Sequence, residues 1–290
     1  RGVRPRTRPH LRKMKIAVAS GKGGAGKTSI AASLVLGRPG SLAMDLDVEE
    51  PNLGILLGFE GGTTRPVLQP VAFLEPDLCS ACGRCAQVCE FGAIAWFGSG
   101  LPVVNESLCH GCGACPLVCP TGAMRERDRE VGTIRSGTAA GGPFIEGRLR
   151  VGSVSTVRVI DETIRAGTEF KAHDWIMDGP PGVSCPAATV LRAADAALMV
   201  AEPTPFGLSD LASVLEVASD LKKPTAIVVN KAGLGERPLD DLCRRFSVKV
   251  LEGFPFTRSA AEAGALGRCP YGTDADWAAR TGRLWRAIER

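Results

Sequence analysis

Long hydrophobic runs are missing from this 290-residue sequence: no stretch approaches the roughly 18 apolar residues that a membrane-spanning helix needs. The apolar core of a secretory signal is also missing, since residues 1–13 hold six Arg and Lys and no acidic residue. Without such a signal, the 11 cysteines are not expected to form disulfides. We therefore expect a soluble, cytoplasmic protein whose cysteines carry other chemistry.

The body of the chain has no excess of positive charge. The formal net charge of the whole chain is +4, but residues 14–290 hold 29 Lys and Arg against 31 Asp and Glu, about −2. We expect residues 1–13 to be a disordered basic leader, with a tail that contacts an acidic partner as the alternative. A nucleic-acid partner is not expected, because the argument for one would rest on the leader alone.

Two kinds of segment alternate along the body. Buried-strand patterns occur at Ile16–Ser20, Leu42–Asp45, Trp175–Asp178, Ala196–Ala201, Thr225–Asn230 and Val248–Glu252. Helical patterns follow most of them, at Ser29–Leu36, Pro186–Ala193, Ser209–Leu221, Leu239–Phe246 and Ser259–Leu266. Buried strands separated by helices predict an α/β fold, a parallel sheet flanked by helices on both faces.

The alternation stops between residues 76 and 127. This cysteine-dense segment is too short for a helix pair with its own core, so something other than hydrophobic burial must hold it together. We predict an inserted domain at 76–127 within a discontinuous domain formed by 14–75 and 128–290. The Gly-rich segment Gly132–Gly152 is predicted to be irregular strand and loop.

A phosphate-binding loop is predicted at residues 20–29, SGKGGAGKTS. Its glycines let backbone amides converge on an anion without Cβ clashes, and the helix that starts near Thr28 directs its positive end at the phosphates. Lys27 would reach the β- and γ-phosphates, and the Thr28 hydroxyl would ligate Mg²⁺. The predicted nucleotide-binding residues of this loop are Gly21, Lys22, Gly23, Gly24, Ala25, Gly26, Lys27, Thr28 and Ser29.

With its extra early lysine, Lys22, the stretch GKGGAGKT resembles the deviant Walker A motif of the MinD/ParA and nitrogenase-iron-protein superfamily. In that group the early lysine, here Lys22, reaches across a dimer interface to the partner's nucleotide. The resemblance implies an ATPase in which ATP binding and dimerisation are one event. The partner would be a second copy of the chain or a similar chain, giving a homodimer or a heterodimer.

Three further stretches resemble this family. AMDLDVEEPNLG looks like switch I, where Asp47 would position the attacking water and Asp45 would help to hold the Mg²⁺ water shell. WIMDGPPG looks like Walker B and switch II, which implies that Asp178 lies on the same shell. VVNK at 228–231 matches the purine-recognising asparagine, Asn230. The implied activity is Mg²⁺-dependent ATP hydrolysis, with Lys22, Lys27 and Asp47 as catalytic residues.

Two cysteine runs, CSACGRCAQVCE and CHGCGACPLVCP, each have the C-x2-C-x2-C-x3-C spacing of [4Fe–4S] ligation, in which the fourth cysteine serves the other cluster. Zinc sites would leave this spacing unexplained. The predicted ligand sets are Cys79, Cys82, Cys85 and Cys119 for one cluster, and Cys89, Cys109, Cys112 and Cys115 for the other. The segment resembles a bacterial two-cluster ferredoxin, except that Glu90 rather than proline follows Cys89.

Together these features resemble MinD-superfamily ATPases with an inserted ferredoxin domain, and three functions stay open. The first is ATP-gated electron transfer to a redox partner. The second is delivery of an iron–sulfur or metal centre to a metalloprotein. The third is spatial regulation on membrane or DNA. Eight ligands that saturate two clusters favour electron carriage over transfer of labile clusters.

Two other features have alternative interpretations. The amphipathic C-terminal segment WAARTGRLWRAIER is predicted to dock on its own core rather than on a membrane. Cys185 lies seven residues after Asp178, in DGPPGVSCP. It is either a packed core thiol or a thiol near the dimer axis that moves with the nucleotide state and binds a labile metal or shared cluster.

Overall fold

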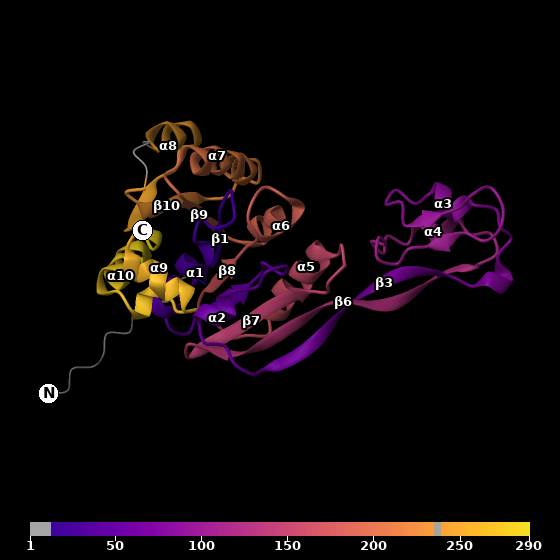
Figure 1. Ribbon diagram of the computed structural model, residues 1–290, viewed down its shortest axis with the longest axis horizontal. Helices are drawn as coiled ribbons and strands as arrows, with labels where there is room; N and C mark the ends of the chain where they lie inside the picture. Colours follow the sequence, from indigo (N-terminus) through magenta and orange to yellow (C-terminus); the bar gives the residue numbers. More distant parts are fainter. Residues whose placement is uncertain (1–12, 235–238) are drawn as a thin grey trace.

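The computed structural model describes residues 13–234 and 239–290 (Figure 1), so the predicted basic leader, apart from Lys13, lies outside the described residues. A nine-stranded sheet in this part of the chain has the order β11-β10-β9-β1-β8-β2-β7-β6-β3. Strands β11 to β7 of that order are parallel, and β6 and β3 are antiparallel additions. The strands are β1 Lys15–Ala19, β2 Leu42–Asp45, β3 Thr63–Leu74, β6 Met124–Ala139, β7 Gly142–Leu149, β8 Trp175–Asp178, β9 Ala196–Ala201, β10 Thr225–Ala232 and β11 Val250–Pro255.

Helices cover both faces of the parallel part, which confirms the predicted fold class. Alternate residues of β1 point to opposite faces. Ala17 and Ala19 pack in the core beneath α5, α6 and α7, whereas Ile16 and Val18 pack beneath α1 and α10. The helices of this body are α1 Lys27–Gly37, α2 Leu53–Leu56, α5 Thr156–Gly167, α6 Cys185–Ala193, α7 Pro205–Asp220, α8 Asp240–Phe246, α9 Arg258–Ala265, the short 3₁₀ helix η2 Pro270–Gly272 and α10 Ala275–Ile288.

The C-terminal helix α10 docks on α1, as its amphipathic pattern predicts. The indole N–H of Trp285 donates to the Leu34 carbonyl at 3.0 Å, and that of Trp277 donates to Ser33 Oγ at 2.8 Å. Leu284 between them is fully buried. Within the described ranges, no helix is long and apolar enough to cross a membrane.

The segment predicted to be irregular, Gly132–Gly152, is largely regular: it contains the second half of β6 and all of β7, which pair as an antiparallel hairpin. That prediction was wrong because the glycines serve close packing rather than loop formation. A Cβ on Gly132 would lie 2.5 Å from the Arg148 carbonyl oxygen, and one on Gly147 would lie 2.5 Å from Thr163 Oγ1.

A long ribbon formed by β3 and β6 leaves the body and ends in a small unit (Figure 1). That unit contains η1 Pro76–Leu78, α3 Arg84–Gln87, β4 Ile94–Ala95, β5 Val103–Val104 and α4 Ala114–Val118. Its core has few buried residues: Ala72, Cys85, Ile94, Cys115 and Met124. Because β3 and β6 run continuously from the body into the small unit, the structure marks no break between the two, and the domain boundaries at residues 76 and 127 stay a prediction.

Candidate functional site

The predicted phosphate loop joins β1 to α1 in the middle of the sheet. Gly24 and Gly26 have positive φ angles of 77° and 92°, which residues with a Cβ rarely adopt. Space also requires glycine here: a Cβ on Gly21 would lie 2.2 Å from the Asp210 backbone, and one on Gly26 would lie 2.1 Å from Asn230 Nδ2. The loop therefore packs closely against α7 and β10, and α1 starts directly after it at Lys27.

Two buried carboxylates lie beside this loop, at the carboxyl ends of neighbouring strands. Asp45 of β2 and Asp178 of β8 are in register, and each side chain is almost fully buried. Asp45 accepts hydrogen bonds from the Asp47 N–H at 3.2 Å and the Leu53 N–H at 2.8 Å. Asp178 Oδ1 is buried and has no hydrogen-bond partner. An orphaned carboxylate oxygen beside Lys27 and Thr28 fits a hard cation such as Mg²⁺ and its water shell.

Burial shifts the titration of both carboxylates. It raises the pKa of Asp178 to about 6, although Lys27 and the Thr28 hydroxyl oppose the shift. Burial also raises the pKa of Asp45, and the negative charge of Asp178 adds to the effect. Two acids that repel each other in a dry site are stabilised by a bound divalent cation, which neutralises both.

Asp47 lies in a cavity of about 230 Å³ between the two predicted switches. Burial raises the pKa of Asp47, Lys27 opposes this shift, and Glu50 and Glu49 add to it. The cavity is lined by Asp47, Val48, Glu49, Glu50, Thr156, Pro180, Pro181, Ser184 and Pro186. Cys185, next to this wall, is exposed at the first residue of α6, so the packed core alternative for this thiol is wrong.

Lys22 contacts its own chain: its Nζ donates to Glu202 Oε1 at 2.9 Å. Glu202 also accepts a hydrogen bond from Lys231 at 2.8 Å, and Lys231 donates to the Gly24 carbonyl oxygen at 2.8 Å. Sequence reasoning missed Lys231 and Glu202. Lys231 follows Asn230 in the VVNK stretch, but nothing in the sequence links it to Glu202 or to the phosphate loop.

Asn230 is buried, and its amide donates to the Ala25 carbonyl oxygen at 2.8 Å. It borders a cavity of about 240 Å³ between the phosphate loop and the C-terminal elements. The cavity is lined by Gly24, Gly26, Ser29, Asn230, Lys231, Pro255, Phe256, Thr257, Ala260, Ala261, Gly264, Pro270 and Trp277. A purine base bound in this cavity would lie next to Asn230. The location suits the predicted role of Asn230 in purine recognition, which stays a prediction.

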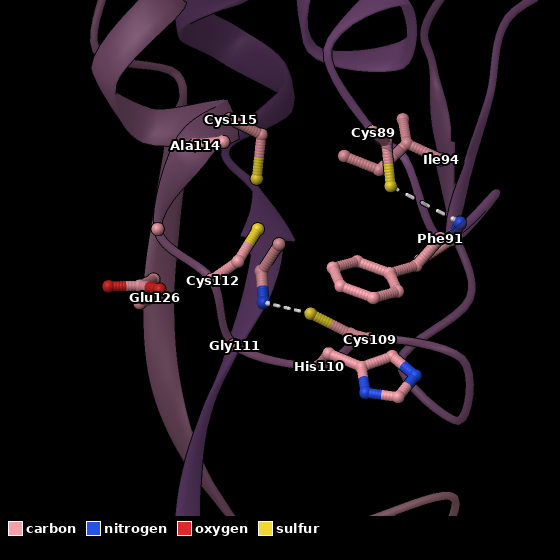
Figure 2. A pocket seen from close by; sticks show the side chains of 13 residues that line it. Cys89, Phe91, Ile94, Cys109, His110, Gly111, Cys112, Ala114, Cys115 and Glu126 are labelled. Atoms are coloured by element: carbon pink, nitrogen blue, oxygen red, sulfur yellow. Dashed lines mark hydrogen bonds between the residues drawn. The ribbon is translucent and has the colours of Figure 1, made fainter. Parts of the chain in front are cut away.

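The eight cysteines of the two runs fall into two groups in space. One cavity is lined by Cys89, Cys109, Cys112 and Cys115, and Figure 2 shows Cys89 facing the other three. A second cavity is lined by Cys79, Cys82, Cys85 and Cys119. Each group takes three thiols from one run and the fourth from the other, the exchange that the spacing predicts. In the described part of the chain, no three His, Cys, Asp or Glu side chains are arranged to hold a single metal ion.

Backbone amides point at four of these sulfurs. The N–H groups of Ala72 and Ala93 donate to Cys109 and Cys89 at 3.4 Å and 3.3 Å. In the other group, those of Ala81 and Met124 donate to Cys79 and Cys119, each at 3.4 Å. Burial raises the pKa of the Cys115 thiol to about 12, so without metal it would stay protonated. Thiol donors with amide hydrogen bonds in a small cavity fit iron–sulfur clusters.

Comparisons with known proteins give matches for the cysteine unit and for most of the chain. Residues 73–123 match the family described as "4Fe-4S dicluster domain". Uncharacterized protein MJ0578 of Methanocaldococcus jannaschii is 35% identical over 246 residues, covering 84% of each chain. Uncharacterized protein MJ0579 of the same organism is 32% identical over 227 residues, covering 77% of this chain and 82% of that protein.

Solved structures resemble the fold. The cell division ATPase MinD of Pyrococcus furiosus gives a TM-score of 0.57 at 19% identity, covering 95% of this chain and 98% of that one. MinD of Pyrococcus horikoshii, complexed with Mg-ADP, gives 0.59 at 17% identity and 96% coverage of both. The chain therefore belongs to the family of MJ0578 and MJ0579, with a MinD/ParA-type P-loop ATPase fold into which a 4Fe–4S dicluster domain is inserted.

Proposed function

We propose that this protein is a cytoplasmic, Mg²⁺-dependent ATPase that couples its nucleotide state to electron transfer through two [4Fe–4S] clusters. We call the carboxyl ends of β1, β2 and β8, with the phosphate loop, Asp45 and Asp178, the nucleotide edge. One observation carries the proposal: β3 and β6, which hold the cysteine unit, belong to the same sheet as these strands. A flexible linker would let the two units act independently. A hydrogen-bonded ribbon instead makes the position of the clusters depend on the body.

At the nucleotide edge, each residue has a chemical role that its position supports. The loop amides and Lys27 bind the phosphates, and Thr28, Asp45 and Asp178 surround Mg²⁺ and its waters. Bound Mg²⁺ would supply charge neutralisation for the transferring phosphoryl group. Asp47, at the cavity between the switches, orients the attacking water. Lys22 serves the partner's nucleotide once the ATP-bound homodimer or heterodimer forms.

The two cysteine groups lie one after the other along the ribbon. Cys109 contacts β3 at two points, since its Sγ accepts from the Ala72 N–H and its carbonyl accepts from the Gln69 amide at 3.0 Å. The other group borders Leu74 and Met124, where the ribbon ends. The Cys109 group is thus nearer the body, and electrons would pass between a body-facing cluster and a distal one.

Potentiometric titration of the anaerobic protein tests this function. The reduction potential of at least one cluster should differ between samples with Mg·ADP and samples with a slowly hydrolysed Mg·ATP analogue. A Lys27→Ala variant, which lacks the phosphate contact, should show no difference. Identical potentials in every nucleotide state of the wild-type protein would refute the coupling.

A separate pull-down with the same ATP analogue identifies the partner, as a protein that binds only in the ATP state.

Exposure of Cys82 and Cys112 favours a second candidate, delivery of clusters to a metalloprotein. An exposed ligand is open to exchange with an acceptor thiol. Incubation with an apo-ferredoxin distinguishes the two functions. A carrier keeps its iron with and without ATP, whereas a delivery factor loses iron to the acceptor in an ATP-dependent way.

A further inference from the structure

We propose that Glu146 and Arg135 form the joint through which the nucleotide edge controls the cluster-bearing ribbon. The inference rests on the proposed coupling of ATP to the clusters and names its route. Glu146 lies on β7 and Arg135 on β6, the strand that runs out to the cysteine unit. Neither residue belongs to a motif of the sequence.

Four charged residues stand in register across four neighbouring strands. Asp178 of β8 pairs with Asp45 of β2, Asp45 pairs with Glu146 of β7, and Glu146 pairs with Arg135 of β6. Residues opposite each other on neighbouring strands are side by side on one face of the sheet. The row therefore runs without a gap from the predicted Mg²⁺ site to the base of the ribbon.

Glu146 is fixed tightly in this row. Its side chain is 2% exposed, and its Oε1 accepts from Arg135 Nη1 at 2.8 Å and from Arg148 Nε at 2.7 Å. A buried carboxylate that loses a cationic partner is strongly destabilised, so a shift of Glu146 should draw Arg135 with it. This ion pair thus links a movement of β7 to one of β6.

Switch I can move β7 directly. The Leu149 N–H at the end of β7 donates to the Val48 carbonyl oxygen at 2.7 Å. Where switch I leads into α2, Asp45 Oδ2 accepts from the Leu53 N–H, and Glu146 Oε2 packs close to Gly54. The segment from Val48 to Gly54 therefore contacts β7 at its first residue and the charged row at its last two residues. When this segment moves, Glu146 is expected to move with it.

Strand β6 carries the movement to the clusters. From Arg135 to Met124 the strand spans about 36 Å at roughly 3.3 Å per residue. Arg150 of the body contacts β6 at two neighbouring residues: its N–H donates to the Val131 carbonyl oxygen at 2.9 Å and its Nη1 to the Glu130 carbonyl oxygen at 3.5 Å. The β3–β6 register shifts at this point. At the far end, the Met124 N–H donates to Cys119 Sγ. A β-bulge at this position bends the ribbon and so sets the direction of its outer part, which carries the cysteine unit.

The test compares nucleotide affinity between oxidised and dithionite-reduced holoprotein, because coupling between two sites is reciprocal. The probe is a slowly hydrolysed Mg·ATP analogue, and the readout is the ratio of the two Kd values. Wild-type protein should show a ratio of at least about fivefold, the lower end of typical couplings. Glu146→Gln, which keeps the side-chain size, and Arg135→Gln, which leaves Glu146 paired with Arg148, should each bring the ratio near one.

Arg65→Gln is the matched control. It removes one positive charge from the same ribbon. Arg65 pairs with Ile134, next to Arg135, so its side chain lies on the opposite face of the sheet, where it forms an exposed ion pair with Glu169 at 2.9 Å. It should keep the wild-type ratio, and iron content should be equal in all four proteins. If both row variants kept the wild-type ratio, this route would be refuted while the coupling function stood. A ratio of one in the wild-type protein would overturn both.

Discussion

The Lys22 ammonium lies 2.9 Å from Glu202 Oε1 of the same chain, so the lysine that the family resemblance assigns to a partner's nucleotide is engaged internally. Burial raises the pKa of Glu202, but hydrogen bonds from Lys231 and Lys22 outweigh burial, and the pKa is lowered. Glu202 is thus a stable anion between two lysines. Lys22 must leave it before it can reach across a dimer interface.

Opposite effects on dimerisation are expected at the two ends of this pair. Lys22→Ala should bind ATP as a monomer but form fewer ATP-induced dimers and hydrolyse ATP slowly, because the cross-interface contact is missing. Glu202→Gln should dimerise at a several-fold lower protein concentration, because a competing state of Lys22 is weakened. Sedimentation with and without ATP measures both. Normal ATP-dependent dimers in Lys22→Ala would remove Lys22 from the interface.

Asp47→Ala should bind ATP with nearly unchanged affinity and hydrolyse it roughly 10²-fold more slowly, the low end for loss of a positioned acid–base group. Such a group acts in the transition state more than in the ground state. ATP binding and single-turnover hydrolysis are measured on the same preparation, and the closed dimer should accumulate. Failure to bind nucleotide would assign Asp47 to structure instead of catalysis.

The anaerobic protein should hold about eight irons per chain, four in each of two clusters. Cys82→Ser should leave about half, because only the group with Cys79, Cys85 and Cys119 loses a ligand. Cys243→Ser, outside both groups, should keep the full content. Metal analysis that finds zinc, or hardly any iron after reconstitution, contradicts the ferredoxin assignment.

Sequence patterns predicted the parts of this molecule whose signals are local. The phosphate loop and the cysteine runs are short motifs, and the parallel strands are apolar runs near the positions found. The ribbon escaped prediction because β3 contains Pro66 and Pro70, which argue against a strand. The structure tolerates them because β3 is the last strand of the sheet order, so one side of its backbone needs no partner.

Contacts between distant residues could not be predicted in the same way. Lys22 and Glu202 are 180 residues apart, and the register of Glu146 with Asp45 joins residues about a hundred positions apart. Such pairs depend on strand order, which alternation of strands and helices leaves open. The glycines of β6 and β7 led to the wrong prediction of a loop for a related reason. The neighbours that leave no room for a Cβ at Gly132 and Gly147 come from distant parts of the chain, including α5.

Mg²⁺ binding should weaken below about pH 6. The pKa of Asp178 is raised to about 6 in the metal-free fold, so below that value Mg²⁺ must displace a proton. The half-saturating Mg²⁺ concentration should then rise about tenfold per pH unit, as expected for one displaced proton. ATPase assays with varied Mg²⁺ at roughly pH 5 to 8, a range that spans this pKa, measure the change. Asp178→Asn should bind Mg²⁺ poorly at every pH, and an equal slope in that variant would assign the proton elsewhere.

The same shift fixes the sign of the stability change. An unfolded aspartate has a pKa of about 3.9, so between about pH 4 and pH 6 the folded, metal-free protein holds a proton that the unfolded chain has lost. The free energy of unfolding contributed by Asp178 therefore falls as pH rises through this window. Saturating Mg²⁺ should abolish the decrease, since the bound cation stabilises the charged carboxylate.

Labelling of Cys185 should depend on the nucleotide state. The thiol is exposed at the start of α6, next to the cavity that separates Asp47 from Pro180 and Pro181, so movement of either switch changes its surroundings. Alkylation of the holoprotein, followed by mass spectrometry, should be several-fold slower with a slowly hydrolysed ATP analogue than with ADP, because the proposed ATP-bound dimer would cover this thiol. Cys185→Ala identifies the modified site, and Lys22→Ala, which is expected to dimerise poorly, should lose the protection. Equal labelling with ATP analogue, ADP and no nucleotide would place Cys185 away from the interface.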